Sequence, residues 1–225
     1  MLRNPVRIEI ALSKPVETIS QNAYICNEPQ KNKILQALFA QETPQRTLIF
    51  AASKIKVKQL FHDLLRLGIP AAQMHSDLEQ AERDRVMRDF RSGQCPLLVA
   101  TDIVSRGIDI DDIETVINYN VPRDVEDYVH RIGRTARAGK QGRAITLVAP
   151  DERRYFDKIE RFLHQRITRL PLPEGLEPSA ETRHKNNRQR HPRSEQNHPQ
   201  QNGKPVRRPH HRRPRKENKR QDKTT

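Results

Sequence analysis

The chain has 225 residues, 34% of them hydrophobic, and a formal net charge of +14 at pH 7. Its two cysteines, Cys26 and Cys95, lie far apart without a Cys-x-x-Cys motif, which excludes a disulfide framework and a zinc site. The longest apolar run, Leu48–Ala52, is too short to span a bilayer, and Met1–Arg7 lacks the apolar core of a signal peptide. These features predict a cytoplasmic protein with neither a membrane partner nor a metal site.

The predicted elements begin after residues 1–18, where Pro5 and Pro15 favour an extended leading segment. Short apolar runs then predict strands, and apolar residues three or four apart predict helices. The predicted strands are 23–26, 47–51, 71–75, 96–100, 115–119 and 143–148. The predicted helices lie after Pro29, across Val57–Leu65 up to Gly68, across Val86–Phe90 up to Gly93, and across Tyr155–Leu163.

Strands that alternate with helices at this spacing predict an α/β fold, with right-handed crossovers and a mainly parallel sheet covered by helices on both faces. We expect one domain over residues 19–172, between a linker at 1–18 and a tail at 173–225. In such sheets, ligands bind beyond the carboxyl ends of the strands. A functional site is therefore expected in the segments that directly follow the strands.

The end of the chain is strongly basic. Residues 181–225 hold 15 Lys/Arg and four Asp/Glu, and Val206 is the single aliphatic residue among them. Such a segment cannot bury enough apolar surface to offset the entropy of ordering, so it is predicted to be disordered. Its charge favours RNA as a partner over an anionic membrane, because it has no apolar face for insertion. A tail that only keeps the protein soluble is the alternative.

A first polar cluster, Thr101–Ile110, follows the fourth predicted strand. Thr101 and Asp102 would lie at the edge of the sheet, and Gly107 permits close approach of a backbone. A threonine hydroxyl and a glycine backbone suit a phosphate oxygen, and the carboxylate of Asp109 suits a ribose hydroxyl. An ordinary polar loop is the alternative interpretation.

A second cluster, Tyr128–Gly139, contains three arginines and a histidine within eight residues. Arg134 and Arg137 are three residues apart, so on a helical turn they would project in the same direction. Two guanidinium groups aimed at one point need an anion between them, and the γ-phosphate of a nucleotide is such an anion. A solvated basic surface that pairs with Glu126 and Asp127 is the alternative.

A third cluster consists of His75-Ser76-Asp77, followed by Gln80 and Arg83 at the start of a predicted helix. Backbone amides at a helix N-terminus bind phosphate well, and Arg83 would reach a nucleic-acid backbone. The alternative is structural, with Asp77 as the N-cap of the helix and the neighbouring charges at the surface.

In order and spacing, the three clusters resemble the second RecA-like domain of DEAD-box RNA helicases, over roughly residues 3–172. The matching motifs are Leu48-Ile49-Phe50 with Ser53 and Lys54 (motif IV), Gln80-x-x-Arg83 (QxxR), Thr101–Ile110 (motif V) and His130–Gly139 (motif VI). The arginine-rich tail is similar to that of bacterial members in the RhlE-like branch. The resemblance implies a three-layer RecA-like fold with a mainly parallel sheet.

The resemblance also implies ATP as cofactor and RNA as partner, with RNA bound through its backbone and without base readout. The residues implied to contact ATP are Arg134 and Arg137, as arginine fingers on the γ-phosphate, and Asp109, on the ribose. Those implied to contact RNA are Arg83, Thr101, Gly107 and Ser76. Those implied to couple two lobes are Gln80, His130 and Arg131. Ala136 and Ser76 depart from the family pattern, because each stands where Gly is usual.

Neither G-x-x-x-x-G-K-[ST] nor Asp-Glu-Ala-Asp occurs in the sequence. The resemblance therefore implies that ATP is shared with an N-terminal RecA-like lobe that this sequence lacks, and that Mg²⁺ binds through that lobe. The chain is then expected to be an expressed piece, a gene fragment or one half of a split helicase.

Three functional hypotheses remain open at the level of sequence. The first is the C-terminal half of an ATP-dependent RNA helicase, which hydrolyses ATP and remodels RNA duplexes only when joined to a first lobe. The second is a catalytically inert fragment that binds RNA through its basic tail. The third is a lobe of a related DNA helicase, although the form of motif VI fits RNA helicases better. The sequence carries no signal for the oligomeric state.

Overall fold

A computed structural model describes residues 18–102, 113–136 and 141–177, and the elements named below belong to these residues. The strands are β1 Ile19–Ile25, β2 Thr47–Phe50, β3 Ala72–Met74, β4 Leu97–Ala100, β5 Thr115–Asn118, β6 Gly142–Val148 and β7 Thr168–Arg169. The helices are α2 Lys31–Gln41, α3 Lys54–Arg66, α4 Gln80–Arg91, α6 Val125–Ile132 and α7 Arg153–Phe162. Two short 3-10 turns, η1 Glu28–Gln30 and η2 Pro150–Glu152, precede α2 and α7.

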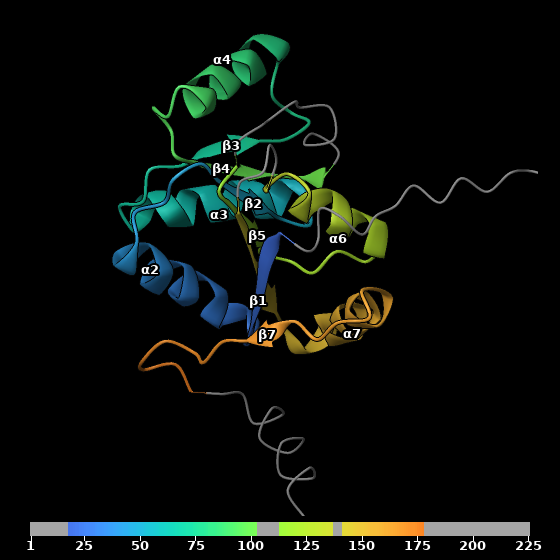
Figure 1. Cartoon of the computed structure of the whole chain (residues 1–225). Coiled ribbons are helices and arrows are strands. Elements are labelled where there is room, and N and C mark those ends of the chain that lie inside the picture. Colours follow the sequence, from blue (N-terminus) through green and yellow to red (C-terminus); the bar gives the residue numbers. More distant parts are fainter. Residues whose placement is uncertain (1–17, 103–112, 137–140, 178–225) are drawn as a thin grey trace, which may run out of the picture. The chain divides into compact units, whose positions relative to one another are not determined.

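The strands of the described residues form one seven-stranded sheet in the order β3-β4-β2-β5-β6-β1-β7, and every pairing is parallel. Parallel neighbours need crossover connections, and helices supply them here. Figure 1 shows α2 and α3 on one side of the sheet and α6 and α7 on the other. The predicted α/β class, with helices on both faces of a parallel sheet, is confirmed.

Successive strand residues point to opposite faces, which divides the core into layers. Ile49 of β2 packs in a buried cluster with α2 and α3. Leu48 and Phe50, on either side of Ile49, pack in a second cluster with Met87 and Phe90 of α4. A third cluster joins β1 and β6 to α6 and α7. The central strands are apolar on both faces because helices cover both.

The predicted helix at Val57–Leu65 corresponds to α3, but its buried stripe is narrower than the periodicity suggested. Val57 and Leu64 are buried, whereas Leu65 is 46% exposed. Ser53 is the N-cap of this helix, and its hydroxyl accepts a hydrogen bond from the Lys56 amide at 3.2 Å. Gly68 then ends it at a φ of +73°, as expected for a helix that stops at glycine.

Besides the two 3-10 turns, helix α6 and strand β7 were not predicted. Helix α6 has only eight residues, and most of its buried apolar side chains belong to the segment interpreted as a basic cluster. Strand β7 has two residues, too few for a recognisable pattern. Past β7 the chain stays on the domain as far as Glu177, whose carbonyl oxygen accepts a hydrogen bond from Gln30 at 2.7 Å. The domain limits 19–172 and the disorder of the tail remain predictions.

A buried carboxylate attaches β7 to α7. Glu160 is 5% exposed and accepts two hydrogen bonds from Arg169, at 2.7 and 2.8 Å, and one from the Ile167 amide at 2.7 Å. Burial alone would raise the pKa of Glu160, but the hydrogen bonds and the arginine charges outweigh it and hold the pKa below its usual value. The ionised form of Glu160 therefore stabilises the fold.

We expect Glu160→Gln to lower the free energy of unfolding at pH 7 by about 1.5–3 kcal/mol, the usual range for hydrogen bonds to a charged group. A carboxyl whose pKa is depressed in the folded state contributes stability above its unfolded pKa of about 4.3, and this contribution is lost as the pH falls. The difference between wild type and variant should therefore shrink below about pH 4. Urea denaturation at several pH values measures this difference in the free energy of unfolding, with the exposed Glu174→Gln as control. A difference that does not change with pH contradicts this role of Glu160.

Candidate functional site

The carboxyl ends of four neighbouring strands lie level with one another. Phe50 of β2 is in register with Ala100 of β4 and with Asn118 of β5, and Met74 of β3 pairs with Ala100. The segments that follow these strands therefore leave the sheet along one edge, where ligands bind in parallel sheets. Thr101, predicted to contact RNA, is half-buried at this edge.

Arg131 of α6 joins the segments that follow β4 and β5. Its side chain is 3% exposed, and its Nε and Nη2 donate to the two carboxylate oxygens of Asp102 at 2.6 and 2.7 Å. Nη1 donates to Asn118 Oδ1 at 3.1 Å and to the Asn120 carbonyl oxygen at 2.8 Å. The guanidinium also lies 5.0 Å from the Phe50 ring centroid. Arg131 is thus held inside the domain by a bidentate ion pair.

Helix α6 ends before Arg134. Its last residue is Ile132, Gly133 is the C-cap, and the Arg134 amide donates to the Arg131 carbonyl oxygen at 3.1 Å in a turn. Ala136 has a φ of +57°, so the chain leaves the right-handed helical conformation there. Arg134 therefore lies in a turn and not on the α-helix, and a shared direction of Arg134 and Arg137 stays a prediction. The turn follows directly on Arg131, and Arg137 lies outside the described residues.

The turn is attached to the sheet through Thr135. This side chain is buried, and its hydroxyl donates to the carbonyl oxygens of Ile113 at 2.5 Å and Glu114 at 3.1 Å. A Cβ on Gly142 would lie 2.4 Å from Thr135 Oγ1 and 2.8 Å from the Ala136 nitrogen, so only glycine fits at the start of β6. Ala136, beside this close approach, has a left-handed φ of +57°, which costs about 1–2 kcal/mol for a residue with a Cβ. This accounts for glycine being usual at position 136.

The third cluster forms the turn after β3. His75 is 2% exposed, and its Nδ1 accepts a hydrogen bond from the Asp77 amide at 3.2 Å, while Ser76 is exposed. The structural alternative predicted Asp77 as the N-cap of α4, and this is wrong, because the N-cap is Glu79. The carboxylate of Asp77 instead pairs with Lys58 and Lys54, each at 2.9 Å, and these bonds lower the pKa of Asp77 to about 2.

Gln80 and Arg83 lie on the first turn of α4, directly after this cluster. Gln80 is exposed and donates to Asp84 Oδ1 at 2.9 Å. Arg83 is half-buried, and within the described part of the chain its Nε has no hydrogen-bond partner. A buried guanidinium nitrogen without an acceptor is costly, so Arg83 is an exception among the buried polar groups of the described residues.

Several predicted site residues have no described position. Gly107 and Asp109 fall in 103–112, and Arg137 falls in 137–140. His130 is exposed on α6. Among the described residues no group of histidine, cysteine, aspartate and glutamate could hold a metal ion, and no helix there is long and apolar enough to cross a membrane.

The partners of Arg131 are not predicted by the sequence motifs. Asp102 is predicted at the sheet edge but without a role, and no role is predicted for Asn118 or Asn120. Their common signal is local, since each polar residue ends or directly follows an apolar strand. That pattern identifies residues at the edge, but the pairing itself depends on the sheet order.

The fold, together with the Arg131–Asp102 pair at the carboxyl edge, defines the class of RecA-like helicase lobes. Comparison with known proteins supports this class. The profile of the helicase conserved C-terminal domain matches residues 30–139. SrmB of E. coli, solved with regulator of ribonuclease activity A, superposes with a TM-score of 0.66 at 32% identity, over 72% of this chain and 98% of that one. S. cerevisiae Dbp5 bound to RNA and ADP BeF3 gives 0.65 at 34% identity, over 68% and 42%.

Two curated relatives are named as RNA helicases, in agreement with this class. RhpA of Helicobacter pylori, a DEAD-box ATP-dependent RNA helicase, is 34% identical over 77% of this chain and 35% of its own length. The ATP-dependent RNA helicase DbpA of Bacillus subtilis is 38% identical, over 76% and 36%. The chain therefore belongs to the DEAD-box RNA helicase family and comprises its C-terminal helicase domain. It spans about a third of the length of these relatives, and the RhlE-like branch stays a prediction.

We expect Asp102→Asn to destabilise the domain by about 2–3 kcal/mol, because it leaves a buried guanidinium without its anion. The effect should stay below that of a fully buried pair, since the Asp102 side chain keeps 27% of its surface exposed. Urea denaturation of the chain measures the change. The exposed Asp151→Asn serves as control and should alter stability by less than about 0.5 kcal/mol. Equal stability of Asp102→Asn and wild type would mean that the pair is not formed.

Proposed function

We propose that this domain is the C-terminal half of an RNA-stimulated ATPase that remodels RNA duplexes. The observation that carries the proposal is the bidentate Arg131–Asp102 pair, which joins the segment after β4 to the arginine turn after α6. These are the motif V and motif VI segments of the family. Their connection at the carboxyl edge of the sheet suits a nucleotide bound between this lobe and a first one.

In this proposal ATP supplies the phosphoryl group, and the first lobe would hold its phosphates and Mg²⁺. This chain would contribute Arg134 and Arg137 to the charge that spreads over the γ-phosphate in the transition state. Asp109 would accept a hydrogen bond from the ribose. Arg134 suits this role because it lies in the turn after α6, three residues past the buried Arg131, whose carbonyl oxygen accepts a hydrogen bond from the Arg134 amide. No carboxylate cluster that could hold a metal ion lies among the described residues.

RNA would bind through its sugar–phosphate backbone at the β3 end of the same edge. The placement of Arg83 and Ser76 supports this, because Arg83 lies on the first turn of α4 and the exposed Ser76 lies in the turn before that helix. Thr101 and Gly107 would contribute from the segment after β4. Contacts to phosphate and sugar, and not to base edges, give binding without sequence preference. Closure of the two lobes over RNA and ATP would involve Gln80 and His130.

The decisive experiment is ATP hydrolysis with and without single-stranded RNA, for this chain alone and with a DEAD-box first lobe supplied in trans. Activity that needs both the first lobe and RNA supports the proposal. RNA binding without hydrolysis in either case would leave an inert RNA-binding fragment. Equal stimulation by RNA and by DNA of the same sequence would favour a DNA helicase lobe, because the 2′-hydroxyl distinguishes the two nucleic acids.

With the first lobe present, we expect Arg134→Ala and Arg137→Ala each to reduce kcat for ATP hydrolysis by about 10³-fold or more, the usual worth of an arginine finger. RNA affinity should change little, because these side chains would contact ATP. Arg123→Ala, at an exposed position just before α6, is the matched control and should keep wild-type turnover. Turnover close to wild type in both test variants excludes the arginine-finger role.

The basic tail should contribute an electrostatic part of RNA affinity. Each phosphate neutralised on single-stranded nucleic acid adds about −0.7 to the slope of log affinity against log salt. Truncation after Ala180 removes a net charge of +11 with residues 181–225 and should flatten this slope. Fluorescence anisotropy across a salt series tests it. If the slope survives truncation, the tail plays no part in RNA binding.

A further inference from the structure

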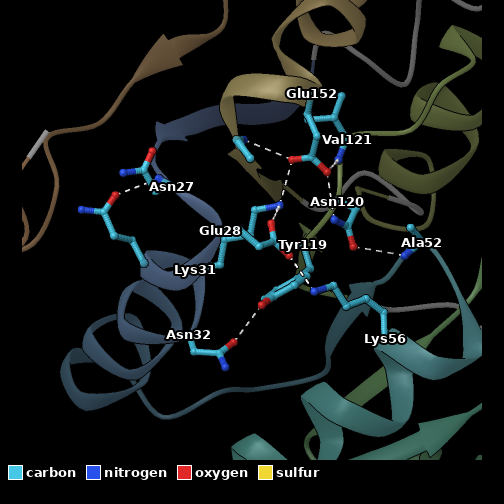
Figure 2. Close-up of polar contacts among 12 residues, drawn as sticks. Asn27, Glu28, Lys31, Asn32, Ala52, Lys56, Tyr119, Asn120, Val121 and Glu152 are labelled. Carbon is cyan, nitrogen blue, oxygen red and sulfur yellow. Dashed lines mark hydrogen bonds and ion pairs between the residues drawn. The ribbon is translucent and has the colours of Figure 1, made fainter. Parts of the chain in front are cut away.

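A second buried cation lies at the carboxyl edge, on the opposite side of the sheet from Arg131. Lys31, the first residue of α2, is 0% exposed and pairs with Glu28 and Glu152, each at 2.8 Å (Figure 2). Its ammonium also lies 5.2 Å from the centroid of the Tyr119 ring. Lysine is rarely buried to this extent, and it is stable there only because both carboxylates compensate its charge.

Glu152 extends this contact to the ends of β5 and β6. Its Oε1 accepts a hydrogen bond from Asn120 Nδ2 at 2.8 Å and one from the Val121 amide at 3.3 Å. Its Oε2, which pairs with Lys31, also accepts from the Ala149 amide at 3.1 Å. The carboxylate therefore fixes the segments that follow two strands, and Lys31 fixes the carboxylate.

Asn120 connects the two sides of the sheet. Its carboxamide is held at both ends, because Nδ2 donates to Glu152 and Oδ1 accepts from the Ala52 amide at 3.2 Å. Its backbone carbonyl oxygen accepts from Arg131 at 2.8 Å. The next residue, Val121, packs in the cluster under α6 and α7, whereas the preceding Tyr119 packs under α2 and α3. Hydrogen bonds thus run without a break from Lys31 to Arg131 and on to Asp102.

We propose that Lys31 and Glu152 are positioning residues for the nucleotide site. By fixing Asn120, they set the direction of the carbonyl oxygen that Arg131 needs, and Arg131 in turn holds Asp102 and the turn that begins at Gly133. The claim that these residues affect catalysis rests on the proposed function. The claim that they fix the position of Arg131 does not.

The contacts of Arg131 indicate how this arginine would respond if the hydrogen bonds between Glu152 and Asn120 were lost. Without Glu152, Arg131 keeps both oxygens of Asp102 and Asn118 Oδ1, so it stays buried and paired. It loses only the acceptor whose direction Asn120 sets. The arginine should then occupy a wider range of positions in a domain that remains folded, and a catalytic group that depends on it loses its preorganised geometry.

The first test is a spectroscopic signal of Arg131 in the 225-residue chain, which needs no first lobe. The Nε–H of Arg131 should give a resolved NMR resonance that exchanges slowly with water. We expect Lys31→Met and Glu152→Gln each to shift it and to speed its exchange by about tenfold or more. Lys33→Met, an exposed position on the same helix, is the matched control and should leave the resonance unchanged.

A double variant separates positioning from mere stability. Either single change leaves a buried charge with one partner fewer, and such a change can unfold a domain. Lys31→Met with Glu152→Gln removes both charges together and should restore folding, measured by urea denaturation, whereas the Arg131 resonance should remain shifted. An Arg131 resonance identical to wild type in folded variants overturns the inference and leaves the network as a structural contact only.

The second test uses the first lobe. We expect the double variant to lower kcat for RNA-stimulated ATP hydrolysis by about tenfold or more, with a smaller change in KM for ATP, since geometry and not binding is altered. If wild type shows no hydrolysis with the first lobe, the proposed function fails, but the resonance of Arg131 still decides the positioning role. A shifted resonance with wild-type kcat would remove the catalytic part of the inference.

Discussion

The arrangement of this domain depends on a guanidinium buried at the carboxyl edge of the sheet. Burying the charge of Arg131 is costly unless an anion and further acceptors surround it, and Asp102, Asn118 and the Asn120 carbonyl oxygen meet that need. These acceptors belong to the ends of two different strands, β4 and β5. The charge can therefore be buried only when β4, β2 and β5 pair in the observed register.

A second constraint lies where β5 and β6 begin, after α6 has ended. Thr135 occupies the space that a side chain at position 142 would need. The next residue, Ala136, has a left-handed φ. A helix could not continue through this point, and Arg134 lies in the turn between the end of α6 and this contact. Strained backbone of this kind persists where the surrounding packing determines it, as it often does at functional sites.

Two buried cations, Arg131 and Lys31, lie at one edge on opposite faces of the sheet, and Asn120 bonds both to Arg131 and to Glu152, the partner of Lys31. The proposed nucleotide and RNA sites would account for a polar edge. They do not by themselves account for a lysine buried against Glu152 on the far face. Low local dielectric makes such networks rigid when every group is satisfied, which is the property a site assembled from separate loops requires.

The sequence by itself determined the alternation of strands and helices and hence the parallel sheet, because apolar runs and a period of 3.6 are properties of consecutive residues. It also determined the identity of the motif residues, which were recognised by their order and spacing along the chain. It did not determine that α6 ends before Arg134, since the close approach of Thr135 to Gly142 is a contact between separate segments. Nor did it indicate that Lys31 is buried against Glu152, 121 residues away, or that Arg131 binds Asp102, 29 residues away. Those partners were decided by strand order and register, which bring distant residues together only once the sheet has formed.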